Sequence, residues 1–286
     1  MEKILEGKKL ADKLNFKLKA KIDDIVKKIG TRPKLATILL GKDPASKVYV
    51  NIKHKTCTKV GIESHLVELS EDTNKTELLN EIEILNNDNT IHGILLQLPL
   101  PMKLRDFIPH FHEKISPIKD VDGFHPINRG KLFDYNEEFA PCTPKGIIAL
   151  LENYNIEIKG KDVTIINRSN LVGKPLIFMF LKRNATPSIC HTSTRDIGRY
   201  IKQADILIVA VGRPNFITEE KIKNDVIIVD VGINRVEGKL VGDVDFKGVF
   251  EKCGAITPVP GGVGPLTVSF LLRNTFSAFK KQLDIN

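Results

Sequence analysis

Between residues 8 and 29, apolar residues recur every three or four positions, which predicts an amphipathic helix. Gly30 and Pro33 follow and indicate where this helix ends. Short apolar runs then predict buried strands at residues 35–40, 64–69 and 91–97, with helices between them at 45–60 and 74–86. Strands that alternate with helices in this way predict a parallel sheet covered on both faces.

A second alternation follows a connection rich in proline and glycine, which we place near residues 123–142. The expected strands are 162–167, 188–191, 206–211 and 226–231, and the expected helices are 143–153, 173–183, 197–203 and 266–281. This succession is typical of a doubly wound nucleotide-binding domain. We therefore expect an α/β protein made of two three-layer α/β domains, the second a Rossmann-like doubly wound parallel sheet.

Composition is compatible with this picture. A chain of 286 residues suits one large domain or two moderate ones, and 42% of its residues are hydrophobic. No apolar run approaches the roughly 18–20 residues that span a membrane, and the charged N-terminus lacks a signal-peptide core. The four cysteines are far apart and form no metal or redox motif. We expect a cytoplasmic protein with reduced thiols, no bound metal and no membrane partner.

The net charge of +8 is compatible with a nucleic-acid partner or with a polyanionic small molecule. Acidic residues are interspersed among the basic ones along the whole chain, and no basic helix or tail is present. A solvated lysine-rich surface is therefore favoured over nucleic-acid binding.

Polar residues follow two strands of the second half. Arg168 and Ser169 come after the strand that ends at Asn167, in a loop that is not the GxGxxG fingerprint but leads to a helix N-terminus. Such a loop can bind an anion through the guanidinium, the hydroxyl and the positive helix end. The next strand ends at residues 191–195, which carry hydroxyls and Arg195 where an NAD site would carry an acid. This favours NADP over NAD, although residues 192–194 taken singly resemble helix caps.

Polar residues also stand out in the first half. Tyr49 and Lys53 share a helix face, which by itself is an ordinary solvated face. Gln97 ends an apolar strand, and residues 120–123 form a tight turn with two carboxylates, Asp120 and Asp122. Residues 257–265 form a loop with small side chains, which a flat ligand can approach closely.

Five motifs in order give a full-length resemblance to a known family. They are Gly41-x-Asp43-Pro44-Ala45-Ser46-x-x-Tyr49-Val50-x-x-Lys53, Gly93-Ile94-Leu95-Leu96-Gln97-Leu98-Pro99-Leu100-Pro101, Lys119-Asp120-Val121-Asp122-Gly123, Pro141-Cys142-Thr143-Pro144-x-Gly146 and Pro258-Val259-Pro260-Gly261-Gly262-Val263-Gly264-Pro265. The chain resembles the bifunctional methylenetetrahydrofolate dehydrogenase/methenyltetrahydrofolate cyclohydrolase family.

The resemblance implies an enzyme that oxidises 5,10-methylenetetrahydrofolate with NADP and then hydrolyses the product to 10-formyltetrahydrofolate. It implies a folate-binding catalytic domain at residues 1–140, completed by the helix at 267–286, and an NADP-binding domain at 141–266. The active site is expected in a cleft between them. The partners implied are one-carbon derivatives of tetrahydrofolate and a second copy of the chain in a homodimer.

The resemblance also implies roles for individual residues. Lys53 is similar to the catalytic lysine, Gln97 to the side chain that holds it, Tyr49 to the aromatic packed on the folate ring and Asp122 to the carboxylate that binds the pterin. The other substrate-binding residues implied are Leu98, Pro99, Pro260, Gly261 and Gly262. The cofactor-binding residues implied are Asn167, Arg168, Ser169, Gly173, Thr192 and Ile233.

The chain departs from the family pattern in two places. The usual Gly-Arg-Ser is Asn167-Arg168-Ser169 in this chain, and the usual His-Ser-x-Thr is His191-Thr192-Ser193-Thr194. The second change keeps a hydroxyl, and asparagine tolerates a left-handed backbone better than most residues.

Two other classes of protein remain open from the residues alone. One is a different two-domain dehydrogenase, such as one for shikimate or an amino acid, which would lack the Tyr49, Lys53, Gln97 and Asp122 set. The other is a non-catalytic protein that senses nucleotides or binds nucleic acid.

Overall fold

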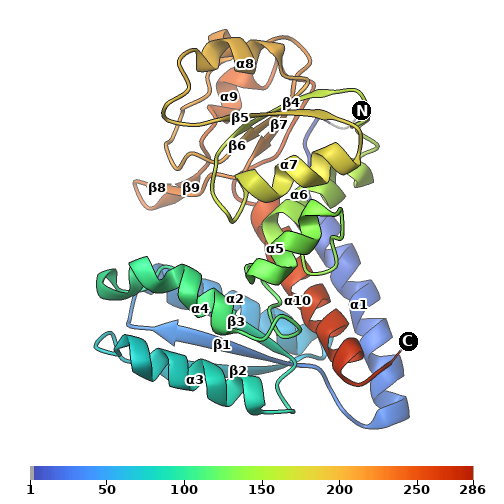
Figure 1. Ribbon diagram of the computed structural model, residues 1–286. Helices are drawn as coiled ribbons and strands as arrows, with labels where there is room; N and C mark the ends of the chain where they lie inside the picture. The colour runs from blue at the N-terminus through green and yellow to red at the C-terminus, as the bar shows by residue number, and fades with distance from the viewer. Residues whose placement is uncertain (1–2, 286) are drawn as a thin grey trace. The chain divides into compact units, whose positions relative to one another are not determined.

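The computed structural model describes residues 3–285, which divide into two compact units (Figure 1). The three-stranded unit comprises Lys13–Lys131, Glu138–Ala140 and the stretch from Val268 onwards. The five-stranded unit comprises the stretch up to Asp12, Leu132–Glu137 and Pro141–Thr267. Each unit contains its own parallel sheet, as the two alternations in the sequence predict.

In the three-stranded unit the sheet has the order β2-β1-β3. Its strands are β1 (Lys34–Leu40), β2 (Glu63–Leu69) and β3 (Gly93–Leu96), and both pairings are parallel. Every residue of β1 from Leu35 to Leu40 is buried, so both faces of the central strand are covered. The helices and short 3-10 helix of this part of the chain are α1 (Gly7–Ile29), α2 (Pro44–Val60), α3 (Lys75–Asn87), η1 (Met102–Phe107), α4 (Ile108–Lys114), α5 (Pro126–Phe133) and α10 (Val263–Gln282).

Apolar side chains from the sheet and two helices form the core on one face of this sheet. Ile38 and Ile94 from the strands cluster with Leu78 and Ile82 from α3 and with Phe111 from α4. Helix α3 begins with a capping box, in which Asn74 accepts from the Glu77 N–H and the Glu77 carboxylate accepts from the Asn74 N–H.

In the five-stranded unit the sheet has the order β10-β7-β6-β4-β5, with all pairings parallel. The strands are β4 (Asp162–Ile166), β5 (Thr186–Cys190), β6 (Ile206–Val209), β7 (Ile227–Asp230) and β10 (Ala255–Ile256). From β4 the chain first adds β5 on one side and then adds β6 on the other. The direction of growth therefore reverses between β4 and β6, and ligands of doubly wound sheets bind at such a point.

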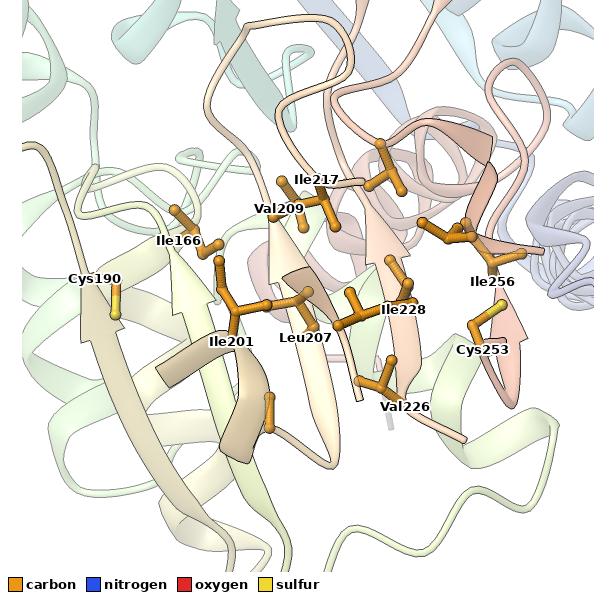
Figure 2. Packing of buried hydrophobic residues seen from close by; sticks show 14 residues of the cluster. Ile166, Cys190, Ile201, Leu207, Val209, Ile217, Val226, Ile228, Cys253 and Ile256 are labelled. Atoms are coloured by element: carbon orange, nitrogen blue, oxygen red, sulfur yellow. The ribbon is translucent and has the colours of Figure 1, made fainter. Parts of the chain in front are cut away.

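A second apolar cluster packs on one face of this sheet (Figure 2). It includes Ile166 of β4, Val209 of β6 and Ile228 of β7, together with Ile201 of α8. In Figure 2, Ile166 and Val209 lie near the carboxyl ends of their strands. The other elements of this unit are α6 (Cys142–Asn153), α7 (Gly173–Lys182), α8 (Ile197–Gln203), η2 (Glu219–Lys221), β8 (Asn234–Val236), β9 (Lys239–Val241) and α9 (Phe246–Val249).

The structure differs from the sequence-based expectation at several boundaries. Helix α5 lies within the stretch expected to be the connection between the two alternations, where proline and glycine obscure its helical pattern. The β8–β9 hairpin, α9 and β10 are too short to be recognised from periodicity. Strand β6 ends at Val209, two residues earlier than expected, because the Val211 N–H donates to the Asp243 carboxylate instead of a neighbouring strand.

Among residues 3–285, no helix combines the length and the apolar character needed to cross a membrane.

Candidate active site

Lys53 and Gln97 are in direct contact in the three-stranded unit. Lys53 lies on α2, and its Nζ donates a hydrogen bond of 2.9 Å to Oε1 of Gln97, which follows the last residue of β3. The Gln97 Nε2 donates to the Leu98 carbonyl oxygen at 2.6 Å. This second bond fixes which way the amide points, so that its oxygen faces the lysine. Both side chains are half-buried.

Helix α2 carries Lys53 on a well-defined frame. Asp43 caps its N-terminus by accepting from the Ser46 N–H at 2.7 Å, and Gly61 ends it with φ of +89°. Tyr49 is half-buried one turn before Lys53, so the two side chains share a face. Cys57, one turn after Lys53, is fully buried, and burial raises the pKa of its thiol to about 12. That thiol is therefore structural.

The turn that contains Asp122 is held by its buried neighbour Asp120. The Asp120 carboxylate accepts from the N–H groups of Gly123, Phe124 and His125 and from the Asn128 side chain, at 2.8–3.1 Å. Burial nevertheless raises the pKa of Asp120. The two aspartates of the turn therefore differ in environment, because Asp120 is buried and Asp122 is half-buried.

Two further side chains position this turn. Lys119 is buried, and its Nζ donates to the carbonyls of Leu85, Asn86 and Asp88 at the end of α3. On α10, Asn274 donates to the Val121 carbonyl at 2.8 Å.

The turn also lies beside β3. Asp120 forms a parallel bridge with Ile94 of β3, so residues 120–122 run in the same direction as that strand. Asp122 and Gln97 therefore come at the same edge of the unit.

The remaining residues predicted to bind folate lie in two units. Leu98 is half-buried and Pro99 is exposed, directly after Gln97. Pro260, Gly261 and Gly262 belong to the five-stranded unit, where the Gly261 carbonyl accepts from the Lys8 N–H at 2.8 Å. A Cβ atom at Gly7 would lie 1.9 Å from the Gly262 oxygen, so the small residues of this loop already serve close backbone packing.

The loop after β4 is organised by the side chain of Asn167. Its Oδ1 accepts from the Ser169 N–H at 2.8 Å, the Ser169 hydroxyl at 2.7 Å and the Gly173 N–H at 3.0 Å. Its Nδ2 donates to the Ala210 carbonyl at 2.7 Å. Asn167 does not have a positive φ, so its tolerance of a left-handed backbone is not used. The side chain, rather than the backbone, gives this residue its role.

The same loop forms hydrogen bonds with the N-terminus of α7. The Val172 N–H donates to the Ser169 hydroxyl at 3.1 Å, and the Lys174 N–H donates to the Ser169 carbonyl at 3.0 Å. A Cβ atom at Gly173 would lie 2.1 Å from the Asn167 carbonyl oxygen, so only glycine fits there. The N–H groups of Val172, Gly173 and Lys174 at the start of this helix are thus already bound within the chain.

The other residues predicted to bind the cofactor present exposed surface. Arg168, Thr192 and Ile233 are exposed, and they follow β4, β5 and β7 respectively. Carboxyl ends of parallel strands lie at one edge of a sheet, so these three residues come to the edge that contains the switch point between β4 and β6.

Two buried carboxyl groups hold the rest of this edge. Asp243 is fully buried and accepts from the N–H groups of Val211, Gly212 and Arg213 and from the Asn234 amide, at 2.6–3.0 Å. Asp230 accepts from the N–H groups of Gly232, Asp243 and Val244, at 2.9–3.0 Å. Burial raises the pKa of Asp230 to about 6, and the neighbouring Asp243 acts in the same direction.

Sequence reasoning did not find the residues that support these sites. They are Lys119, Asn128, Asn274, Asp230 and Asp243. Lys119 stands within a motif that the sequence displays, whereas Asn274 and Asp243 find their partners only after folding. In the described part of the chain, no three His, Cys, Asp or Glu side chains are grouped so that they could hold a metal ion.

Comparison with known proteins gives a full-length match. The catalytic-domain model of the tetrahydrofolate dehydrogenase/cyclohydrolase family matches residues 5–122, and its NAD(P)-binding-domain model matches residues 141–283. The bifunctional protein FolD of Sulfurihydrogenibium sp. (strain YO3AOP1) is 50% identical over 282 residues, which cover 98% of both chains.

Two solved structures extend the match to three dimensions. The bifunctional FolD methylenetetrahydrofolate dehydrogenase/cyclohydrolase of Campylobacter jejuni has a TM-score of 0.93 and 47% identity, covering 97% of this chain and 99% of that one. The Trypanosoma brucei methylenetetrahydrofolate dehydrogenase-cyclohydrolase, solved with NADP cofactor and inhibitor, has a TM-score of 0.93 and 34% identity over 98% of each chain.

Proposed function

Because the chain belongs to the tetrahydrofolate dehydrogenase/cyclohydrolase family, we propose that its Lys53–Gln97 pair performs the second of two successive reactions. The chain oxidises 5,10-methylenetetrahydrofolate to 5,10-methenyltetrahydrofolate by hydride transfer to NADP, and then hydrolyses that product to 10-formyltetrahydrofolate. The observation that carries the residue assignment is the hydrogen bond of 2.9 Å between Lys53 and Gln97.

The hydrolytic step needs a group that moves protons. Water adds to the bridging carbon of the methenyl cation and loses one proton to the Lys53 amine. The protonated Lys53 returns this proton to the ring nitrogen as the bond between that carbon and the nitrogen breaks, and the second proton from water leaves to solvent. Gln97 orients the amine without placing a negative charge beside it, so it does not favour the protonated ammonium as a carboxylate would.

The oxidative step depends on alignment more than on a reacting side chain. When bound, NADP supplies the acceptor for the hydride. Arg168 offers an exposed guanidinium at the carboxyl end of β4, where a phosphate of the dinucleotide can be bound by charge and by paired N–H donors. Together with the hydroxyl of Thr192 and the apolar side chain of Ile233, this set fits NADP. Gly173, Ser169 and Asn167 shape the loop that carries Arg168.

Folate and NADP are assigned to different parts of the chain. We propose that residues 1–140 with the helix 267–286 bind the pterin, and that residues 141–266 bind NADP. Asp122 accepts hydrogen bonds from the amino-pyrimidine edge, and Tyr49 packs on the ring. Leu98, Pro99 and the loop Pro260–Gly262 are the other residues that we propose for folate binding.

One assay tests the two reactions together. Methylenetetrahydrofolate is mixed with the protein and NADP, and the near-ultraviolet absorbance of the methenyl product is followed. We expect the absorbance to rise with NADP reduction and then to decay, with NAD supporting a slower rise. A rise without decay would refute the hydrolase, and no rise with either nucleotide would refute the dehydrogenase.

The role of Asp122 is tested by Asp122→Ala. Charge-assisted hydrogen bonds contribute about 1.5–3 kcal/mol each, so we expect KM for folate to rise by roughly tenfold to a hundredfold in both reactions. Asp106→Ala, an exposed aspartate of η1, is the matched control. Normal folate binding by Asp122→Ala would show that this carboxylate does not bind the pterin.

We further propose a homodimer that works in the cytoplasm. The dimer rests on family resemblance, and sedimentation equilibrium measures it directly as twice the mass of 32.0 kDa. All four cysteines are free and buried, which suits a reducing compartment.

A further inference from the structure

Asn167 occupies a special place in the five-stranded sheet. It directly follows Ile166, the last residue of β4, and Ala210 directly follows Val209, the last residue of β6. Figure 2 shows Ile166 and Val209 on these two strands. The bond of 2.7 Å from Asn167 Nδ2 to the Ala210 carbonyl therefore crosses the switch point between β4 and β6.

The same side chain uses both ends of its amide. While Nδ2 is bound to the end of β6, Oδ1 gathers the Ser169 N–H, the Ser169 hydroxyl and the Gly173 N–H at 2.7–3.0 Å. An amide oxygen has two lone pairs, so three donors converging on it saturate the acceptor. The loop from residue 167 to 173 is thereby closed into one hydrogen-bonded ring.

The hydrogen bonds of the closed ring limit which groups of the loop can bind a phosphate. The hydroxyl of Ser169 donates to Asn167 and accepts from Val172, and the Gly173 and Lys174 N–H groups are bound within the chain. Arg168 stands between Asn167 and Ser169 in this ring, and its side chain is exposed.

We infer that Asn167 is a positioning residue for NADP: it closes the β4–α7 loop across the switch point so that the Arg168 guanidinium, and not the Gly173 and Lys174 N–H groups or the Ser169 hydroxyl, binds the cofactor phosphate. This inference rests on the proposed function and assigns Asn167 and Ser169 an indirect part in it. When an apo site is already in its binding conformation, affinity is not reduced by the fraction of molecules in other conformations.

The first test is direct binding of NADP, measured by calorimetry without folate. In Asn167→Ala the ring loses all four bonds, and we expect the dissociation constant to rise by about tenfold to a hundredfold as the closed loop becomes a minor state. Asn170→Ala is the matched control, because Asn170 is in the same loop and its amide holds only the exposed Lys174. We expect Asn170→Ala to bind NADP as the unmodified protein does.

The second test separates positioning from direct contact. If Ser169 acts through Asn167, then Ser169→Ala raises the dissociation constant in the unmodified background but by less than about twofold in the Asn167→Ala background. Independent, multiplicative effects of the two substitutions would mean that Ser169 touches the cofactor itself, and would overturn the inference.

A general loss of folding is distinguished by the other reaction. Hydrolysis of methenyltetrahydrofolate needs no NADP as acceptor, so we expect its kcat to be unchanged in Asn167→Ala, while KM for NADP rises in the dehydrogenase reaction and kcat at saturating NADP is retained. Asn167→Gly and Asn167→Ser are measured alongside. A parallel fall of both activities, or loss of folded protein in all three variants, would assign Asn167 to the fold as a whole and overturn the inference.

The proposed function fails separately from this inference. If the unmodified protein binds no NADP, the cofactor assignment is wrong. If it binds NADP and Asn167→Ala binds equally tightly, only the positioning role is wrong.

Discussion

In the three-stranded unit the side chain of Lys53 is held by another side chain, whereas in the five-stranded unit the half-buried Asn167 and the buried Asp243 hold loop backbone. Lys53 is oriented by Gln97, and Gln97 by the neighbouring Leu98 carbonyl. In the five-stranded sheet, Asn167 and Asp243 fix the loops that follow β4 and β6 by binding their N–H groups. The difference matches the work that we propose for each unit, since proton transfer needs a movable polar group and a bound dinucleotide needs a preformed surface.

The largest effect should come from removing the reactive side chain. In Lys53→Ala we expect hydrolysis of methenyltetrahydrofolate to fall by about a thousandfold, the middle of the range for general acid–base catalysis, and hydride transfer to fall by less than about tenfold. Stopped-flow absorbance measures both. Lys55→Ala, an exposed lysine two residues along the same helix, should change neither. Equal losses of the two activities in Lys53→Ala would contradict the proposal that Lys53 serves only the hydrolytic reaction.

Removing a side chain that binds backbone N–H groups should lower the stability of the five-stranded unit. Asp243→Ala leaves the donors of Val211, Gly212, Arg213 and Asn234 without their acceptor, so we expect a loss of about 4 kcal/mol in the five-stranded unit. Hydrogen exchange of the peptides around β6 measures it.

The control for this substitution lies two residues away. Asp245→Ala removes one cap bond, which the Gly248 N–H of α9 donates, and should cost about 1 kcal/mol. If β6 exchanges its amide hydrogens equally fast in the two variants, Asp243 does not hold this edge.

Histidine burial should make the three-stranded unit sensitive to acid. Burial, with a smaller contribution from Arg129, lowers the pKa of His112 from 6.5 to about 4. Between pH 6.5 and pH 4, His112 is therefore protonated in the unfolded chain but neutral in the folded one. The folded state loses stability as pH falls from about 6.5 to about 4. The loss reaches about 3 kcal/mol for this residue.

His112→Leu should remove that part of the acid sensitivity. Urea unfolding of this unit at pH 7 and pH 4.5 measures the difference, and His110→Leu, at a half-buried histidine of the same helix, is the control. An unchanged difference between the two pH values in His112→Leu would show that another group causes the acid sensitivity.

The smallest effect should come from changing the partner of the reactive lysine. Gln97→Glu places a carboxylate on the ammonium, which favours the protonated form, so we expect hydrolysis at pH 7 to fall by about tenfold to thirtyfold and to recover at higher pH. A pH–rate profile measures this. Gln282→Glu, at a glutamine that donates to the His92 carbonyl in the same unit, should leave the profile unchanged. A lower rate with the same pH dependence would mean that Gln97 acts by shape alone.

Many helices and strands could be predicted, because their sequence patterns involve residues close together in the chain. Helix α1 and strand β1 follow from spacing and apolar runs, and the observed boundaries lie within one residue of the expected ones. The pairing of Lys53 with Gln97 was expected from family resemblance, and the structure places these two residues in contact.

The supporting residues could not be predicted, since their partners are distant in sequence. Asn274 reaches the Val121 carbonyl across 153 positions, and Asn167 reaches Ala210 across 43. An asparagine after a strand predicts a turn or a left-handed backbone, and only the folded sheet reveals that its amide bridges two strands.

The most direct test of the division between the two units is the rate of methenyltetrahydrofolate hydrolysis in the absence of NADP, compared between Lys53→Ala and Asn167→Ala. We expect a fall of about a thousandfold in the first variant and an unchanged rate in the second. Equal falls in both, or a full rate in Lys53→Ala, would contradict this division.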